Sequence, residues 1–168
     1  MKKIFALLLG VVAFMGVASA QNYMVVDSEK IFKSIKEYNE AMTQLDNLAQ
    51  LCQKQVDAKF ADIEKLYNSY QQDKSSLSAA SRALRENEIL EKEAEAVKFQ
   101  ETLFGNEGTL MKKRIELIQP IQERVFKAIE SYAKSNGFDL VLDIASNATM
   151  LYYSSSVNRT DEVIKLVK

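Results

Sequence analysis

The chain has 168 residues, with 22 basic and 23 acidic side chains, no histidine and one cysteine. Most metal centres and nucleophilic triads need histidine or several cysteines, so this composition leaves too few parts for those chemistries. The near-neutral charge gives no support for nucleic-acid binding as the main task. We therefore expect neither an enzyme nor a cofactor-binding protein, because no phosphate-loop, dinucleotide or paired-cysteine motif is present.

Residues 1–20 have the pattern of a secretory signal peptide. Lys2-Lys3 is a positive start, residues 4–17 are apolar, and Ala18-Ser19-Ala20 matches a cleavage site. The apolar run is short for a membrane span, so an uncleaved anchor is the weaker alternative. Cleavage after Ala20 removes two lysines and no acid, which leaves 20 basic and 23 acidic residues and a mature charge of −3.

The mature chain begins with a short β-prone run, Tyr23–Asp27, after which Ser28 is predicted to N-cap a helix. From Ile35 to Tyr70, apolar residues then recur in alternating steps of three and four. The a positions hold Ile35, Met42, Ala49, Val56, Ile63 and Tyr70, and the d positions hold Tyr38, Leu45, Cys52, Lys59 and Leu66. Only Lys59 is neither apolar nor aromatic, so the pattern predicts a coiled-coil seam and not an ordinary globular helix.

A second stretch, Arg82 to Leu117, is predicted to return alongside the first. Its matching series, in alternating steps of three and four, is Leu90, Ala94, Val97, Glu101, Phe104, Gly108, Met111, Ile115 and Ile118. The serine-rich segment 75–81 between the two stretches favours a turn, with Ser78 as the N-cap of the return helix. Folded antiparallel, the hairpin places Ile63 opposite Ile89, and a 40-residue arm is roughly 60 Å long.

Three residues of the return stretch predict irregularity. Gly105 and Gly108 each cost about 1 kcal/mol in a helix, and they indicate either close packing of the two arms or a flexible point. Pro120 either kinks the helix or begins a new one, and we expect the arm to enter the body there. Gly105, Gly108 and Pro120 are therefore the predicted hinge residues.

The C-terminal part is predicted to contain two strands and a helix. Asn136-Gly137 ends the long helix, and Phe138–Ile144 follows as a strand. Residues 145–148 form a turn, and Thr149–Ser154 is a second strand that makes a hairpin with the first. Thr160 is predicted to N-cap the last helix, which has acids in its first turn and lysines at its end.

The predicted fold is α+β. A long antiparallel helical hairpin, the coiled-coil arm of residues 35–118 with its tip near 74–81, projects from a small β-containing body of residues 21–34 and 119–168. A body of about 60 residues buries little apolar surface, so we expect the fold to be completed by oligomerisation, most readily as a trimer. The residues predicted at the subunit contact are Val25, Val26, Leu140, Val141, Leu142 and Leu151.

Several apolar residues lie outside the strict seam of the arm and are candidates for contact with a client protein. They are Leu48, Phe60, Tyr67, Leu77 and Phe99. The alternative is that they widen the contact between the two helices. Cys52 is interpreted either as a small apolar filler of the seam or as a thiol for an intermolecular disulfide. Asp139 and Asp143 share one face of the predicted strand, where an edge or subunit-contact role is favoured over acid–base work.

The two ends of the chain resemble one family. The segments Met24–Phe32, Gly137–Asp143 and Thr160–Ile164, around a long helical hairpin, are similar to the Skp/OmpH family of periplasmic chaperones. The resemblance implies a homotrimer with a central β-body, whose arms enclose a cavity that holds unfolded outer-membrane proteins without ATP. Members of that family are often strongly basic and contact lipopolysaccharide and anionic membranes. This mature chain is mildly acidic, so we transfer no such contact.

Two functions follow from these patterns. The first is a holdase chaperone, which binds unfolded clients on its arms. The second is a structural or adaptor coiled-coil protein of the cell envelope. A holdase keeps a denatured outer-membrane barrel soluble without nucleotide, whereas an adaptor does not.

Overall fold

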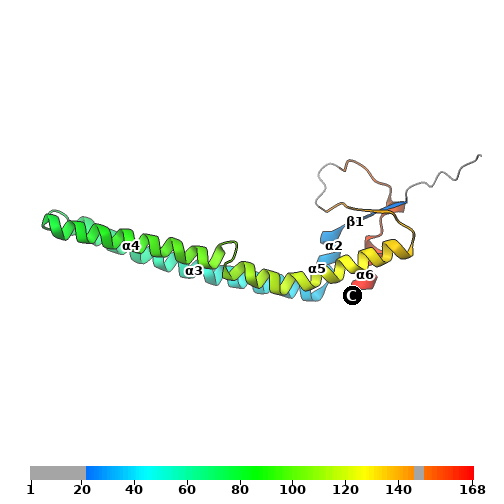
Figure 1. Cartoon of the computed structure of the whole chain (residues 1–168), viewed down its shortest axis with the longest axis horizontal. Helices are drawn as coiled ribbons and strands as arrows, with labels where there is room; N and C mark the ends of the chain where they lie inside the picture. The colour runs from blue at the N-terminus through cyan, green and yellow to red at the C-terminus, as the bar shows by residue number, and fades with distance from the viewer. Residues whose placement is uncertain (1–21, 146–149) are drawn as a thin grey trace, which may run out of the picture. The chain divides into compact units, whose positions relative to one another are not determined.

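A computed structural model gives the structure of residues 22–145 and 150–168. Its elements are β1 (Tyr23–Val26), α2 (Ser28–Lys33), α3 (Lys36–Asp73), α4 (Ala79–Phe104), α5 (Thr109–Ser135), β2 (Leu140–Asp143), the 3-10 turn η1 (Ser155–Val157) and α6 (Thr160–Val167) (Figure 1). The structure is mostly helical with a small two-stranded sheet. The predicted signal peptide lies outside the described residues. So do residues 146–149, which include most of the turn predicted at 145–148.

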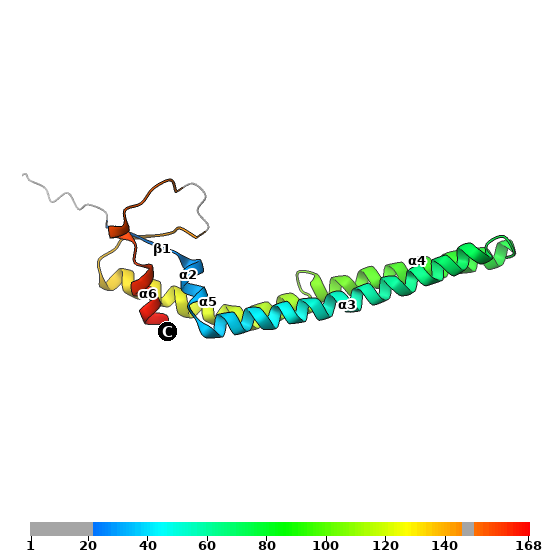
Figure 2. The ribbon, with the colours of Figure 1, turned by 180° about the vertical axis from the view of Figure 1, so that it is seen from behind.

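The chain divides into two compact units. The hairpin unit is Phe32–Phe126, and in the body unit the described residues 22–31 join those of Lys127–Lys168. In the hairpin unit, α3 and α4 run side by side in opposite directions (Figure 2). The 38 residues of α3 make it about 57 Å long. Ser78 caps α4 as predicted, because its side-chain oxygen accepts a hydrogen bond from the Ser81 N–H at 3.2 Å.

The seam predicted along α3 is confirmed over most of its length. The buried residues of the series are Ile35, Leu45, Cys52, Val56, Ile63 and Tyr70, and Met42, Ala49 and Leu66 are half-buried. Lys59, the polar exception, is exposed, and its ammonium lies 4.9 Å from the centre of the Phe99 ring. The long alkyl stem of a lysine lets its charge stay in water at such a position.

The seam predicted along α4 is wrong by one residue. The buried residues of this helix are Ile89, Ala96 and Leu103, whereas Leu90 and Val97 are 61% and 57% exposed. Ala94 and Glu101 are exposed too. The predicted pairing of Ile63 with Ile89 holds, because both belong to one buried cluster with Tyr70 and Ala96. Because one residue turns a helix by about 100°, the predicted series describes a stripe beside the seam.

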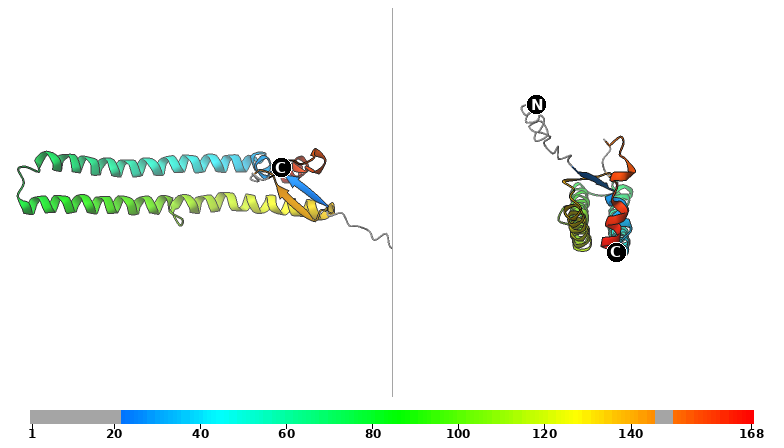
Figure 3. Two further views of the ribbon diagram at one scale, coloured as in Figure 1. Left: turned by 90° about the horizontal axis from the view of Figure 1, so that it is seen from above. Right: turned by 90° about the vertical axis from the view of Figure 1, so that its right-hand side faces the viewer.

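Residues 105–108 explain the error. They interrupt the return arm between α4 and α5 and form a loop that stands off the helix (Figure 3). A Cβ on Gly108 would lie 2.8 Å from the Leu103 carbonyl oxygen, and one on Gly105 would lie 2.5 Å from that of Glu101. The glycines are therefore needed where the loop crosses its own helix end. The three atoms nearest to each of these Cβ positions belong to the same arm, which gives no support to the predicted close packing of the two arms.

The loop keeps the apolar seam of α5 on the same side as that of α4. From Leu103 to the next buried large residue, Ile118, the chain advances 15 residues. Fifteen helical residues would rotate the seam by about 60°, but eleven residues make three full turns to within about 20°. Looping out four residues therefore restores the alignment. The predicted series treats the return arm as one continuous helix. Counting back from Ile118 in steps of three and four through the loop therefore places every α4 position one residue too late.

Pro120 lies inside α5, which continues without a break from Thr109 to Ser135. Of the two predicted alternatives, a new helix that begins at Pro120 is therefore wrong, and a kink at Pro120 stays a prediction. The ring nitrogen cannot donate to the Glu116 carbonyl, and both residues are exposed, so water can replace that bond. The division between the two compact units falls at Phe126 and Lys127, and not at Pro120.

In the body unit, β1 and β2 form a parallel pair, with Tyr23 beside Leu140 and Val26 beside Asp143. The prediction of a second strand at Thr149–Ser154, paired with the first as a hairpin, is wrong. Residues 150–154 have no strand, and Thr149 lies outside the described part. Instead, Val25 makes an isolated bridge to Asn158 on its other side. Composition alone suggested the strand, because Leu151, Tyr152 and Tyr153 are all β-prone.

The two helix caps predicted in the body, Ser28 and Thr160, are wrong, because each residue is the first of its helix. Asp27, and not Ser28, caps α2, because its side chain accepts from the Lys30 N–H at 2.9 Å. Thr160 is the first residue of α6 and is buried. Its hydroxyl donates to the Asn158 side chain at 2.6 Å and accepts from the Asp27 N–H at 2.9 Å. The end of β1 is thereby joined to the start of α6.

Candidate functional site

The hairpin unit has two different long faces, one on each side of the α3–α4 seam. Lys59 touches Phe99 across the first side, and a shallow groove there is lined by Lys59, Asp62, Ile63, Leu66, Lys92 and Glu95. We call this side the groove face. Leu66 and the alkyl stem of Lys59 supply carbon atoms to this groove, and Phe99 lies beside it under the Lys59 ammonium. On both helices, the non-seam residues of this side lie about one residue before, or three after, a seam residue.

The opposite side, which we call the apolar face, is made by Phe60, Tyr67, Leu90 and Val97, all exposed. Leu90 and Val97 each follow a seam residue, and a step of one residue turns the side chain away from the groove face. Phe60 and Tyr67 lie four residues after Val56 and Ile63, which turns them to the same side. The contacts of Lys59 with Phe99 and of Tyr70 with Glu86 fix which residues of α3 and α4 lie at the same height along the hairpin. By this pairing, Phe60 is level with Val97, and Tyr67 is level with Leu90.

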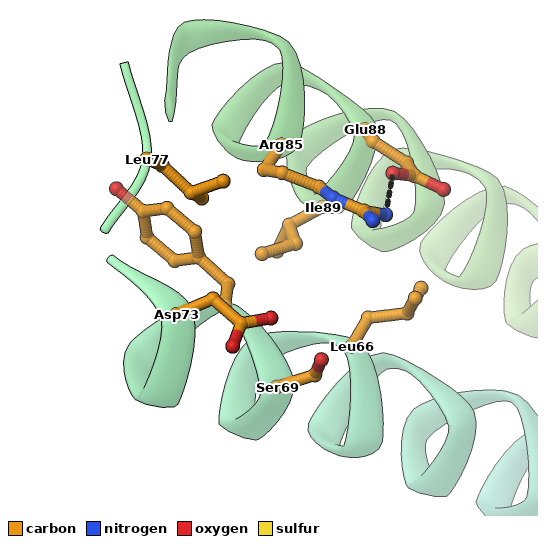
Figure 4. A pocket seen from close by; sticks show the side chains of 8 residues that line it. Leu66, Ser69, Asp73, Leu77, Arg85, Glu88 and Ile89 are labelled. Carbon is orange, nitrogen blue, oxygen red and sulfur yellow. Dashed lines mark hydrogen bonds and ion pairs between the residues drawn. The ribbon is translucent and has the colours of Figure 1, made fainter. Parts of the chain in front are cut away.

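Charges on the groove face are mixed and paired. Lys92 bonds Glu95 at 2.8 Å, and Arg85 bonds Glu88 at 3.1 Å, beside Leu66, Leu77 and Ile89 near the tip (Figure 4). The hydrogen bond and the charge of Lys92 lower the pKa of Glu95, and those of Glu95 raise the pKa of Lys92. Both pairs are exposed to water, so they set the charge pattern of the face more than the stability of the arm.

The five predicted client-contact residues divide into two groups. Leu48 and Phe99 pack against the buried cluster of Cys52, Val56 and Leu103, and Leu77 packs against the cluster around Ile63. Phe60 and Tyr67 project from the apolar face and remain exposed. Only the second group therefore offers free apolar surface within one chain.

Sequence reasoning missed Leu90 and Val97 as exposed residues, because it placed them in the seam. The signal was present, since Ile89, Ala96 and Leu103 repeat every seven residues beside the predicted series. Leu51, Leu84, Ile115 and Phe126 are further exposed apolar residues of the hairpin unit. Cys52 is a free thiol buried between Val56 and Leu103, in the position of an apolar filler.

The residues predicted at a subunit contact lie in the body unit at very different depths. Val25 and Val26 are buried within one chain, and Val141 and Leu142 are half-buried. Leu140 is half exposed, and Leu151 is 96% exposed with Tyr152 beside it. Within the described ranges, no strand pairs with the outer edge of β2. That edge and residues 150–153 are therefore exposed surfaces of the described body at which a partner could bind.

The two aspartates near β2, Asp139 and Asp143, accept hydrogen bonds from backbone N–H groups. Asp143 accepts hydrogen bonds from the Ser28 hydroxyl at 2.5 Å, the Ser28 N–H at 3.0 Å and the Ala145 N–H at 3.0 Å. Partial burial pushes the pKa of Asp143 upward, but these three hydrogen bonds together hold it below its ordinary value. Asp139 accepts from the Asn22 N–H at 3.2 Å. Each carboxylate is thus engaged with the N-terminal segment, as an edge role requires.

Residues 22–145 and 150–168 contain no group of three or more histidine, cysteine or acidic side chains placed to hold a metal ion. Over those same ranges, none of the helices has both the length and the apolar character that crossing a membrane requires.

The described chain thus combines a hairpin of long helices with a small body that contains a parallel pair of strands. The family model described as "Outer membrane protein (OmpH-like)" matches residues 22–167. The chain therefore belongs to the OmpH-like family. The match includes both chain ends and the arms.

Individual relatives agree with the family match. The chain is 28% identical over 150 residues to a protein of Yersinia enterocolitica described as "Chaperone protein Skp", covering 89% of this chain and 87% of the relative. It is also 28% identical to a protein of the same description from Photorhabdus laumondii, covering 91% and 89%. An uncharacterized protein of Aquifex aeolicus is 28% identical over 98% of this chain and 95% of its own length.

Proposed function

We propose that this chain is an ATP-independent holdase chaperone that binds unfolded outer-membrane proteins in a cavity between helical arms. The observation that carries the proposal is the similarity to proteins described as Chaperone protein Skp over about nine tenths of both chains. Residues 1–20, as a signal peptide cleaved after Ala20, would deliver the protein to the periplasm. The proposed function does not involve catalysis by this chain.

The apolar face gives the proposal a physical basis. An unfolded chain exposes apolar side chains, and contact with Phe60, Tyr67, Leu90 and Val97 removes apolar surface from water. Each Å² removed is worth about 25 cal/mol, so many weak contacts along a long arm add up without a deep pocket. Such contacts do not depend on one client sequence. Release requires only that the client find a better partner for the same surface.

We propose further that the functional unit is a homotrimer formed through the bodies. A two-stranded sheet is marginal by itself, and the outer edge of β2 offers unpaired backbone groups to a neighbouring chain. The exposed side chains of Leu140 and Leu151 would be covered in the assembly. Val25 and Val26, already buried, would support it by fixing the sheet. No lipopolysaccharide or membrane contact is part of the proposal.

The test uses a purified outer-membrane β-barrel protein, diluted from urea into buffer without lipid or nucleotide. Light scattering follows its aggregation with and without the mature chain. A holdase suppresses the scattering in proportion to the amount of chain added, and added ATP changes nothing. Aggregation that proceeds at the same rate with the chain present would overturn the holdase function and favour the adaptor alternative.

A further inference from the structure

We propose that the apolar face of the hairpin selects segments of unfolded chain in which apolar residues are interspersed with lysine and arginine. The inference rests on the proposed holdase function and specifies the chemistry that its arm prefers. It is carried by the charge pattern around Phe60, Tyr67, Leu90 and Val97, which differs from that of the groove face.

The carboxylates around the apolar face are on both helices. Asp57 and Glu64 each follow a seam residue of α3, which turns them to the same side as Phe60. On α4, Glu86 and Glu93 lie three residues before and four after Ile89, which also turns them to this side. All four are exposed. Four acidic groups therefore border four exposed apolar side chains.

Lys54 and Arg82 lie three and four residues before Asp57 and Glu86, but no ion pair joins any of the four carboxylates to a cation in the described chain. The lysines level with it, Lys59 and Lys92, lie on the groove face, and Lys65 pairs with Asp62 at 2.9 Å. Glu64 and Glu93 have no hydrogen bond or ion pair in the described chain. Asp57 accepts only from the Gln53 amide at 2.8 Å, and Glu86 accepts from the Tyr70 hydroxyl. On the groove face, by contrast, Glu88 and Glu95 each bond a cation.

The acidic side chains around the apolar face make its binding depend on the charge of the partner. An exposed pair of opposite charges changes an equilibrium constant by about 1.4- to 5-fold, and like charges act in the reverse direction. Several such pairs act together along an extended segment. Cations between the apolar residues of a client therefore strengthen binding, and acids weaken it. An anionic lipid surface is repelled by the same border.

The experiment measures binding of the mature, full chain to two labelled peptides of equal length by fluorescence anisotropy. Both peptides carry the same apolar residues, with lysine at the intervening positions in one and glutamate in the other. At low salt, we expect the lysine peptide to bind about ten-fold more tightly. The preference should shrink at high salt, because ions screen exposed charges.

Three double variants locate the effect. Glu64→Gln with Glu93→Gln removes two carboxylates of the apolar face and should reduce the preference about three-fold or more. Glu88→Gln with Glu95→Gln removes the same number from the groove face and should leave the preference unchanged. Tyr67→Gln with Val97→Gln should weaken both peptides equally. All six side chains lie outside the buried seam, and circular dichroism checks that helicity is kept.

Failure of the inference is distinguishable from failure of the holdase function. Equal binding of the two peptides, or equal effects of the two carboxylate variants, overturns the inference, and the holdase function stands if the barrel still remains soluble. If the barrel aggregates in the presence of the chain and neither peptide binds, both the inference and the holdase function are rejected. Binding to anionic phosphatidylglycerol vesicles that is lost in the Tyr67/Val97 variant overturns the inference in favour of a membrane surface. A lower sedimentation coefficient in that variant overturns it in favour of a subunit contact.

Discussion

At the scale of single residues, the body depends on polar side chains that bridge distant parts of the chain. Asp143 on β2 receives three hydrogen bonds, two of them from Ser28 at the start of α2. Thr160 joins Asp27 to Asn158 in the same way. Sequence reasoning found Ser28 and Thr160 but predicted local caps. A cap signal depends only on residue type and near neighbours, whereas the hydrogen bonds of Ser28 with Asp143 and of Asp27 with Thr160 link residues more than 110 positions apart.

Asp143→Ala is expected to destabilise the body by about 1–2 kcal/mol at neutral pH, because charged hydrogen bonds to Ser28 are lost and their donors are left unpaired. Asp143→Asn should cost less. Urea unfolding monitored by circular dichroism measures both. Glu162→Ala in the exposed first turn of α6 is the control and should change stability by less than about 0.5 kcal/mol. Equal effects of Asp143→Ala and the control would show that the hydrogen bonds do not hold the body.

The same carboxylate predicts how stability changes with acid. The pKa of Asp143 in the folded chain is below its ordinary value of 3.8, so its contribution is fully present above that value. The contribution is lost as the pH falls through the folded pKa, where the unfolded chain binds the proton more readily. Asp143→Asn should therefore flatten the decline in stability below about pH 4. An unchanged acid profile in that variant would contradict the shift.

At the scale of elements, the seam of α3 was predictable and that of α4 was not, for one physical reason. The heptad of α3 runs unbroken, so counting from Ile35 gives every buried residue down to Tyr70 except Ala41. The return arm contains the 105–108 loop, and counting back through it moves the series from Ile89 to Leu90. The composition of Gly-Asn-Glu-Gly marks an interruption. It does not say whether the residues bend the helix or leave it.

The corrected seam predicts opposite effects at adjacent residues. Ile89→Ala removes a buried side chain from the cluster with Ile63 and Tyr70, and should cost about 2–3 kcal/mol. Leu90→Ala removes an exposed side chain and should cost less than about 0.5 kcal/mol. Thermal or urea unfolding of the two variants decides between the registers. A larger loss for Leu90→Ala would restore the predicted seam and refute the observed one.

The loop predicts a local weak point in the return arm. We propose that 105–108, with Pro120, allows the arm to bend, since glycine loops have few buried contacts. Amides of residues 105–108 should exchange hydrogen faster than those of 90–100 and 121–130. Gly108→Ala should lower stability by about 1–3 kcal/mol, because its Cβ would meet the Leu103 carbonyl at 2.8 Å. The matched change Asn68→Ala, on an exposed position of α3, should have no such cost.

Uniform exchange protection across 90–130 would refute the hinge. A stability gain in Gly108→Ala would show that the loop closes into a continuous helix, because alanine favours a helix by about 1 kcal/mol over glycine.

At the scale of the whole molecule, the sequence predicted the class of structure but not how the body is built. The two chain ends do meet in a sheet, as the segments Tyr23–Asp27 and Phe138–Ile144 indicated. The predicted second strand after residue 148 is not seen at residues 150–154, because β-prone side chains alone do not supply a pairing edge. Its exposed apolar residues instead suggest a surface that another chain covers.

Leu151→Asp is expected to weaken the proposed trimer, because a charge would enter a contact between chains. Leu151 is 96% exposed within one chain, so the change should leave the folded monomer intact. Sedimentation velocity across a dilution series measures the effect. Leu84→Asp, on an exposed position of the arm, is the control and should sediment as the wild type. A well-folded wild-type monomer at micromolar concentration would contradict the trimer.

The holdase claim is tested most directly by isolating the complex that it requires. The mature chain is mixed with an outer-membrane barrel diluted from urea, and the mixture is passed over a sizing column with light-scattering mass detection. We predict one soluble species that contains the barrel and the assembled chain, formed without ATP and reduced in the Tyr67→Gln/Val97→Gln variant. Recovery of the chain at its free mass, with the barrel entirely in the pellet, would contradict it.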